Sequence, residues 1–362
     1  MQRSWRAIPV AAVLLAAACG ANTGSGDAAA APKTEEAATI ALFLPESKTT
    51  RYEAFDRPLF EAKVKELCAT CKILYSNADQ DAAKQQQQVE AALTQGADVL
   101  VLDAVDAAAV APLVNQAKQK KVPVIAYDRL ISGIGYDYFV SFNNVRVGEM
   151  QGQALLDALT AKGTANKGEI VMIHGATTDP SSADYKKGAH NVLDGKVKVG
   201  REFDTPDWSP DKAQQEMEQA ITALGRDKIV GVLSANDGMA GGAIAAMKRA
   251  GYTELPPITG QDAELAAVQR ILTGEQYMTI YLNIRAEAEK SAELAVALTK
   301  GQGPAAPAKV NNGTADIPAF LLDPIAVTKD KIKDTIVKDG FYKVGEICTA
   351  EVKDACAKAG LQ

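Results

Sequence analysis

The sequence predicts an α/β protein built from two similar lobes, each a doubly wound parallel sheet with helices on both faces. From residue 39 onward, short apolar runs alternate with longer amphipathic segments, the pattern of successive strand–helix–strand units. The runs are apolar almost throughout, which is typical of strands covered on both sides. The strands that we expect are 39–44, 72–76, 97–103, 122–128, 169–174, 198–203, 229–235, 257–261 and 277–282.

One strand–helix–strand unit occurs twice in the chain. In the first copy the two strands end at Asp103 and Asp128, and in the second they end at Asn236 and Asp262. Ligands of open parallel sheets lie beyond the carboxyl ends of the strands. Two such edges facing one another therefore predict a polar binding cleft between the lobes.

The amino terminus has the features of an export signal. Arg3 and Arg6 precede the apolar run 8–18, which is too short to span a bilayer. The run ends at Ala16-Ala17-Ala18-Cys19, which resembles the lipobox of bacterial lipoproteins. We expect residues 1–18 to be removed and Cys19 to be acylated, with 19–38 as a flexible linker to the outer face of the cell membrane. The alternative is an ordinary cleaved signal and a released, periplasmic protein.

Composition and motifs argue against several other classes of protein. The net charge of -6 provides no basic face for nucleic acid. No Gly-rich phosphate loop follows the first strand, no Gly-x-Ser-x-Gly elbow occurs, and neither histidine is placed to act as a base. Asp128 and Asp262 could be taken for the pair of carboxylates with which an enzyme hydrolyses a glycosidic bond. Arg129, however, would keep Asp128 ionised and unsuited to be the general acid. We therefore expect no enzyme activity and no cofactor.

Four cysteines lie outside the signal, and an even number in an exported chain suggests disulfides. They are Cys68, Cys71, Cys348 and Cys356. Two local bridges are expected, although the sequence allows three pairings. A redox pair or half of a zinc site is the alternative for the Cys-x-x-Cys segment. No metal site is expected, because the two histidines, His174 at a strand end and His190 on a helix face, are far from the cysteines in sequence.

Five ordered segments give the chain a resemblance to a known family. Over residues 39–328 the sequence resembles the periplasmic sugar-binding proteins of ABC importers, of the ribose-binding type, and most of all their xylose-binding branch. The segments are Asp56-Arg57-Pro58-Leu59-Phe60, Ala126-Tyr127-Asp128-Arg129, Val140-Ser141-Phe142-Asn143-Asn144 with Val147-Gly148-Glu149, Ser234-Ala235-Asn236-Asp237 with Ala240-Gly241-Gly242-Ala243, and Gly260-Gln261-Asp262-Ala263.

The resemblance implies a type I periplasmic-binding-protein fold, whose chain crosses a hinge three times. The crossings would lie near 141–143, 282–284 and 312–318. This gives an N-terminal lobe of 39–141 plus 283–312 and a C-terminal lobe of 142–282 plus 313–340. The cysteine-containing tail, 341–362, exceeds the family pattern and its role is open. The resemblance also implies a monomer that delivers a monosaccharide to an ABC permease by hinge closure.

A sugar site needs bidentate polar partners and an aromatic platform. In the family pattern Asp128 and Arg129 meet the ligand from one lobe, Asn236 and Asp262 from the other, and Trp208 stacks on the ring. Lys48 and Arg51 would reach it from the first loop. The alternative for the strand-end residues is helix capping, for which Asp237 and Glu264 are the better candidates.

The chain departs from the xylose-binding pattern at two positions. Leu282 and Asn283 stand where the pattern has a lysine, and Asp179-Pro180-Ser181-Ser182 replaces an asparagine pair. Ser182 and Asn283 are therefore candidate substitutes, and the sugar is an aldose not fixed by sequence. The remaining alternative is a receptor for a non-sugar or signalling ligand that feeds a sensor; a neighbouring gene for a permease or for a sensor kinase would discriminate.

Overall fold

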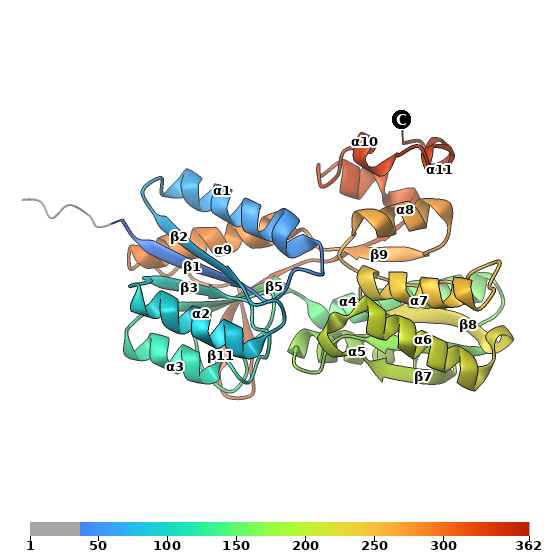
Figure 1. Ribbon diagram of the computed structural model, residues 1–362, viewed down its shortest axis with the longest axis horizontal. Helices are drawn as coiled ribbons and strands as arrows, with labels where there is room; N and C mark the ends of the chain where they lie inside the picture. Colours follow the sequence, from blue (N-terminus) through green and yellow to red (C-terminus); the bar gives the residue numbers. More distant parts are fainter. Residues whose placement is uncertain (1–36, 362) are drawn as a thin grey trace, which may run out of the picture. The chain divides into compact units, whose positions relative to one another are not determined.

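The computed structural model describes residues 37–361 (Figure 1). They belong to one compact unit that contains five hydrophobic clusters. The expected signal sequence, Cys19 and almost all of the linker lie outside the described residues. Within 37–361, no helix is long and apolar enough to cross a membrane.

The first lobe is built on a seven-stranded sheet with the order β10-β11-β5-β4-β3-β1-β2. All neighbours pair in parallel except β10 and β11, which are antiparallel. The strands are β1 (Thr39–Leu44), β2 (Lys72–Asn77), β3 (Val99–Leu102), β4 (Val124–Tyr127), β5 (Tyr138–Phe142), β10 (Ala308–Asn311) and β11 (Asp316–Leu322).

Helices cover both faces of this sheet, and β3 shows why its sequence is apolar throughout. Val99 and Val101 pack in the cluster that includes α1 and α9, whereas Leu100 and Leu102 pack in the cluster that includes α2 and α3. Successive side chains of a strand point to opposite faces, so a doubly covered strand has no polar face. The helices are α1 (Arg57–Leu67), α2 (Ala82–Thr94), α3 (Ala111–Gln119) and α9 (Ile284–Thr299).

The second lobe contains the parallel sheet β7-β6-β8 and the antiparallel pair β12-β9. The segment expected as a strand at 257–261 joins them through two single bridges, Val232–Ile258 and Gln261–Ile280. Helices α4 and α5 cover one face and α6 and α7 the other. The elements are β6 (Glu169–His174), β7 (Val199–Asp204), β8 (Ile229–Ser234), β9 (Met278–Tyr281), β12 (Ile325–Thr328), α4 (Asn144–Ala161), α5 (Pro180–Leu193), α6 (Pro210–Leu224), α7 (Asp237–Arg249) and α8 (Leu265–Thr273). The predicted two-lobed α/β fold class is confirmed.

Two glycines let α4 and α5 approach closely. A Cβ atom on Gly148 would lie 1.9 Å from the carbonyl oxygen of Tyr185, and one on Gly188 would lie 2.0 Å from that of Val145. Only glycine fits at such backbone contacts. The contact fixes the position of α5, whose first two turns face the cleft.

The chain crosses between the lobes at 142–144, 281–284 and 322–325. The first two crossings were expected at 141–143 and 282–284. The third lies further along, because β11 pairs with β5 and therefore completes the first sheet, although 313–340 was expected in the C-terminal lobe. Within β11, Pro318 lies beside β10, near the edge of the sheet, where a proline is tolerated.

The carboxy-terminal segment packs on α8 and contacts both lobes. Its short helices α10 (Val344–Ile347) and α11 (Lys353–Lys358) share a cluster with α8. Phe341 stacks on Phe55 of the first lobe at a centroid distance of 4.2 Å and meets Tyr281 of the second edge-on at 5.2 Å. Cysteine sulfurs lie at bonding distance in both expected local pairs, Cys68–Cys71 and Cys348–Cys356.

Candidate functional site

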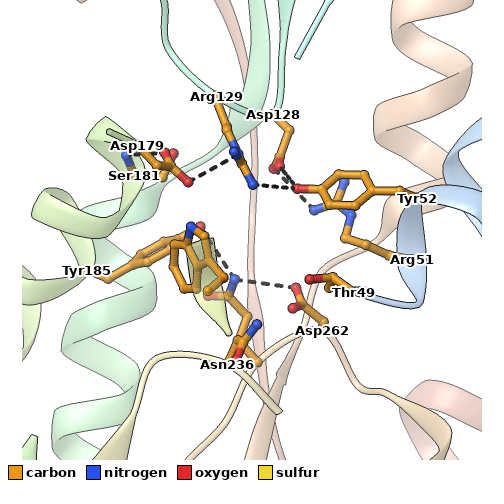
Figure 2. Close-up of a pocket in the computed structure, with 12 residues that line it drawn as sticks. Thr49, Arg51, Tyr52, Asp128, Arg129, Asp179, Ser181, Tyr185, Asn236 and Asp262 are labelled. Atoms are coloured by element: carbon orange, nitrogen blue, oxygen red, sulfur yellow. Dashed lines mark hydrogen bonds and ion pairs between the residues drawn. The ribbon is translucent and has the colours of Figure 1, made fainter. Parts of the chain in front are cut away.

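A small polar cavity lies where the strand ends of the two lobes face each other (Figure 2). Its walls come from both lobes, and most of the side chains are polar or aromatic. The lining residues are Thr49, Arg51, Tyr52, Asp128, Arg129, Asp179, Ser181, Tyr185, Trp208, Asn236, Gln261 and Asp262.

Asp128 follows β4 directly and has a left-handed backbone, with φ of 58°. This conformation is uncommon for a non-glycine residue and persists only where surrounding contacts hold it. The Asp128 N–H donates to the carbonyl of Val140 at 2.9 Å, and the Ser141 hydroxyl donates to the Asp128 carbonyl at 2.7 Å. Strand β5 thus fixes the turn that presents the carboxylate to the cavity.

Arg51 is a buried hub for three carboxylates. Its Nε and Nη2 atoms donate to Asp56 at 3.0 and 2.7 Å, and Nη2 also donates to Glu287 at 2.6 Å. Nη1 donates to Asp128 at 3.1 Å. The guanidinium is therefore occupied by protein partners, and its main effect at the cavity is to orient Asp128 as an acceptor.

Arg129 connects the two lobes. Its Nε lies 3.2 Å from a carboxylate oxygen of Asp179, the residue that caps α5, and 3.5 Å from Asp103. Nη1 donates to the carbonyl of Ala104 at 3.2 Å, and Nη2 donates to the Tyr52 hydroxyl at 3.4 Å. Burial raises the pKa of Asp103 well above its usual value, and the like charge of Asp128 raises it further, while Arg129 opposes both. Residues of both lobes thus hold the Arg129 guanidinium in place, where it can act as a forked hydrogen-bond donor.

Asn236 combines capping with a position in the cavity wall. Its Oδ1 accepts the N–H of Met239 at 2.9 Å and caps α7. The expectation that Asp237 caps this helix is wrong, because the Asp237 carboxylate instead accepts from Gln276, Thr279 and the N–H of Glu264. The cap engages the carbonyl end of Asn236, so the amide N–H end is the one available to a ligand.

Asp262 is the carboxylate of the cavity wall with the fewest hydrogen-bond partners among the described residues. It is 5% exposed, and among the described residues its carboxylate accepts one hydrogen bond, from Gln261 Nε2 at 3.4 Å. Burial raises the pKa of Asp262 to about 7, although Arg51 opposes the shift. A buried carboxylate so poorly satisfied is suited to accept from ligand hydroxyls.

Trp208 forms an aromatic wall of the cavity. It is 8% exposed, and Tyr185 meets its ring edge-on at a centroid distance of 6.3 Å. A Cβ atom on Gly175 would lie 2.1 Å from the indole, so glycine at this position is required for the ring to lie there. The exposed side of the ring can pack against the C–H face of a sugar.

Six predicted site residues line the cavity and three do not. Lys48 is exposed, Ser182 lies buried beside the lining residue Ser181, and Asn283 caps α9 by accepting the N–H of Ala286 at 3.1 Å. The six that line it are Arg51, Asp128, Arg129, Trp208, Asn236 and Asp262. Sequence reasoning did not assign Thr49, Tyr52, Asp179, Ser181, Tyr185 and Gln261 to the site, although Thr49, Tyr52, Ser181 and Gln261 each directly adjoin a predicted residue.

The raised pKa of Asp262 predicts a pH dependence of stability. The folded carboxyl keeps its proton up to about pH 7, whereas the unfolded one loses it near 3.8. The folded state therefore binds more protons in this window, and its stability falls as pH rises through it, by about 4 kcal/mol at most. We expect Asp262→Asn to raise the melting temperature of the sugar-free protein more at pH 8 than at pH 4. An equal change at both pH values would contradict the shift.

Residues 40–303 match the family model described as a periplasmic binding protein domain. The chain belongs to this family. A D-xylose-binding periplasmic protein of Escherichia coli is 37% identical over 313 residues, which cover 85% of this periplasmic binding protein and 92% of the relative. A multiple sugar-binding periplasmic receptor of Rhizobium radiobacter is 33% identical over 74% of the chain and 81% of the relative.

A solved structure supports the same assignment. An ABC transporter solute-binding protein of Clostridium phytofermentans with bound β-D-glucose matches this periplasmic binding protein with a TM-score of 0.79 at 27% identity, over 85% of the chain and 99% of that structure. The predicted family is thus confirmed, and with it an exported protein that binds a solute and is not an enzyme.

Proposed function

We propose that the protein binds one monosaccharide, xylose or a related aldose, in the cavity between its lobes and delivers it to an ABC permease. The observation that carries the proposal is the cavity wall itself, where Asp128 and Arg129 of one lobe face Asn236 and Asp262 of the other beside Trp208. Relatives named for D-xylose and for several sugars are in line with it.

The wall has the donors and acceptors that a pyranose requires. Sugar hydroxyls both donate and accept, so the carboxylates take their protons while Arg129 and the Asn236 amide donate to their oxygens. Hydrogen bonds to charged groups are strengthened where closure excludes water. The indole of Trp208 covers the apolar face of the ring.

Contacts between the lobes support delivery by hinge closure. The N–H of Ala107 donates to the carbonyl of Thr178 at 3.1 Å, and Gln80 Nε2 donates to that of Asp207 at 3.3 Å. Each contact joins a residue of the first lobe to one of the second, as does the Arg129–Asp179 ion pair. A sugar bound to both walls adds to these contacts and shifts the population toward the closed form that a permease recognises.

The remaining parts of the proposal rest on sequence and on the family. Cys19 follows a lipobox-like segment and would carry the lipid anchor, with the linker as a spacer. The two cysteine pairs would be disulfides in an exported protein. The protein is proposed to act as a monomer, without cofactor.

A thermal-shift screen of pentoses, hexoses and inositols tests the function. A ligand that binds only the folded form raises the melting temperature by mass action, so we expect one or two monosaccharides to do so. If no sugar produces a shift, the non-sugar receptor becomes the better assignment.

The sugar identified in the screen also allows a test of Trp208 as the aromatic platform. Trp208→Ala should weaken sugar binding by about 1–3 kcal/mol while the protein remains folded, because the sugar ring loses the indole surface on which it stacks. Trp208→Phe keeps an aromatic face and is the matched control, with a smaller loss. Unchanged affinity in the alanine variant, measured by titration calorimetry, would remove Trp208 from the site.

A further inference from the structure

A second cluster of polar side chains lies in the C-terminal lobe, outside the sugar cavity. It joins His174 at the end of β6, His190 on α5 and Glu202 on β7. Glu202 Oε1 lies 3.2 Å from His174 Nε2 and 3.1 Å from His190 Nε2. One ligand atom from each residue lies within 4.8 Å of the other two. These are the only two histidines of the chain, brought together from positions 16 residues apart.

The state of His174 indicates a missing partner. Its side chain is fully buried, and among the described residues neither ring nitrogen has a hydrogen bond of acceptable geometry. Buried polar groups in native proteins are almost always satisfied, because an unpaired one loses its hydrogen bonds to water without replacement. The contact with Glu202 at 3.2 Å leaves the ring close to the carboxylate without satisfying it.

A second carboxylate orients His190 as a metal ligand requires. Asp194, the residue that follows the last residue of α5, places its Oδ1 atom 2.8 Å from His190 Nδ1. A carboxylate in this place holds the proton on Nδ1 and turns the lone pair of Nε2 toward the ion. Nε2 of His190 faces Glu202, near which His174 Nε2 also lies, so loss of a proton from Nε2 would turn a lone pair toward the place between these three groups.

The spacing fits a small borderline metal ion. Two ligands bound to tetrahedral zinc at ~2.0–2.1 Å lie ~3.3 Å apart, close to both distances from Glu202. Two imidazoles and one carboxylate suit zinc, whereas calcium and magnesium prefer oxygen ligands alone. We propose that His174, His190 and Glu202 form a zinc site, with water at the fourth position.

Lys186 competes with the metal ion for Glu202 and therefore lowers the affinity of the site for zinc. Its Nζ lies 2.9 Å from Glu202 Oε1 and 3.1 Å from Asp204. The side chain is one third exposed, so it can turn toward solvent and leave Glu202 to the ion. The competing charge makes the site weaker than it would be without the lysine.

The location of the cluster suggests what the ion would stabilise. It ties the ends of β6 and β7 to α5, the helix whose first turns carry Asp179 and Ser181 into the sugar cavity. His174 also directly precedes Gly175, against which Trp208 packs. Zinc would therefore stabilise the part of the second lobe that positions Asp179, Ser181 and Trp208 in the sugar cavity.

The test is zinc titration of the protein without residues 1–36 and without a histidine tag; residues 37–362 form a compact unit, and the five hydrophobic clusters found among the described residues all lie within it. We expect one zinc per chain by calorimetry and a rise in melting temperature that magnesium does not produce. His190→Ala should weaken binding by more than ~100-fold, and Asp194→Asn by ~10–100-fold. Lys186→Met should bind zinc several-fold more tightly.

The variants also separate the metal site from loss of fold. His190 has a side chain that is 30% exposed and does not line the sugar cavity, so His190→Ala should keep a cooperative melting transition and its response to sugar. Zinc binding undiminished in His190→Ala, or no binding at millimolar zinc in wild type and in Lys186→Met, would overturn the proposal. Neither result bears on whether the cavity binds sugar.

Discussion

Replacing Arg51 by methionine lowers the free energy of unfolding by about 3–5 kcal/mol, because three carboxylates lose the charge that compensates their burial. Asp56, Asp128 and Glu287 all contact this guanidinium, and the arginine is 3% exposed. Methionine has a similar length and replaces the packing of the stem. The loss therefore reports the unpaired charges rather than an empty cavity.

Urea denaturation at pH 7 measures the effect of Arg51→Met, and Arg57→Met is its matched control. Arg57 pairs with Glu53 and Glu61 on an exposed surface and is 41% exposed, so the control should change stability by less than about 1 kcal/mol. A loss below that value in Arg51→Met would mean that the carboxylates take up protons at little cost when the arginine is removed.

At pH 8, where the Asp262 carboxyl is ionised, Asp262→Ala weakens sugar binding by about 1.5–3 kcal/mol, which is about 10–150-fold in Kd, because ligand hydroxyls lose a buried charged acceptor. The effect at Asp262 should exceed that at other wall residues, since its carboxylate has a single long hydrogen bond from the protein among the described residues. Asp128, in contrast, is already held by Arg51 and Tyr52.

Titration calorimetry with the sugar found in the screen measures this loss. The matched control is Asp227→Ala, whose side chain is 87% exposed and does not line the cavity. The control should bind as wild type does. Retained tight binding in Asp262→Ala, in a protein that binds sugar, would place the ligand elsewhere in the molecule.

Much of the fold follows from local pattern. The strand limits expected at 39–44 and 169–174 are those of the structure, because a doubly covered strand needs an uninterrupted apolar run. Position at the end of such a run was also enough to predict Asp128 and Asp262, since the chain turns there toward the ligand edge. Local sequence pattern was therefore sufficient to predict the fold class and the polar residues at the ends of these strands.

Long-range contacts decided the rest. Arg51 is tied to Glu287, 236 residues away, so its role as a hub is invisible in any local segment. Strand β11 joins the first sheet through its pairing with β5, whereas the resemblance placed 313–340 in the C-terminal lobe.

The sequence by itself determined an exported α/β protein of two lobes, with acidic and amide side chains at the strand ends, because these features depend on composition and on periodicity along the chain. Only the tertiary structure decided that Tyr185 lines the cavity and that His174 meets His190 and Glu202. The physical reason is that the burial and the partners of a side chain depend on helix packing and strand order, which bring together residues that no local pattern connects.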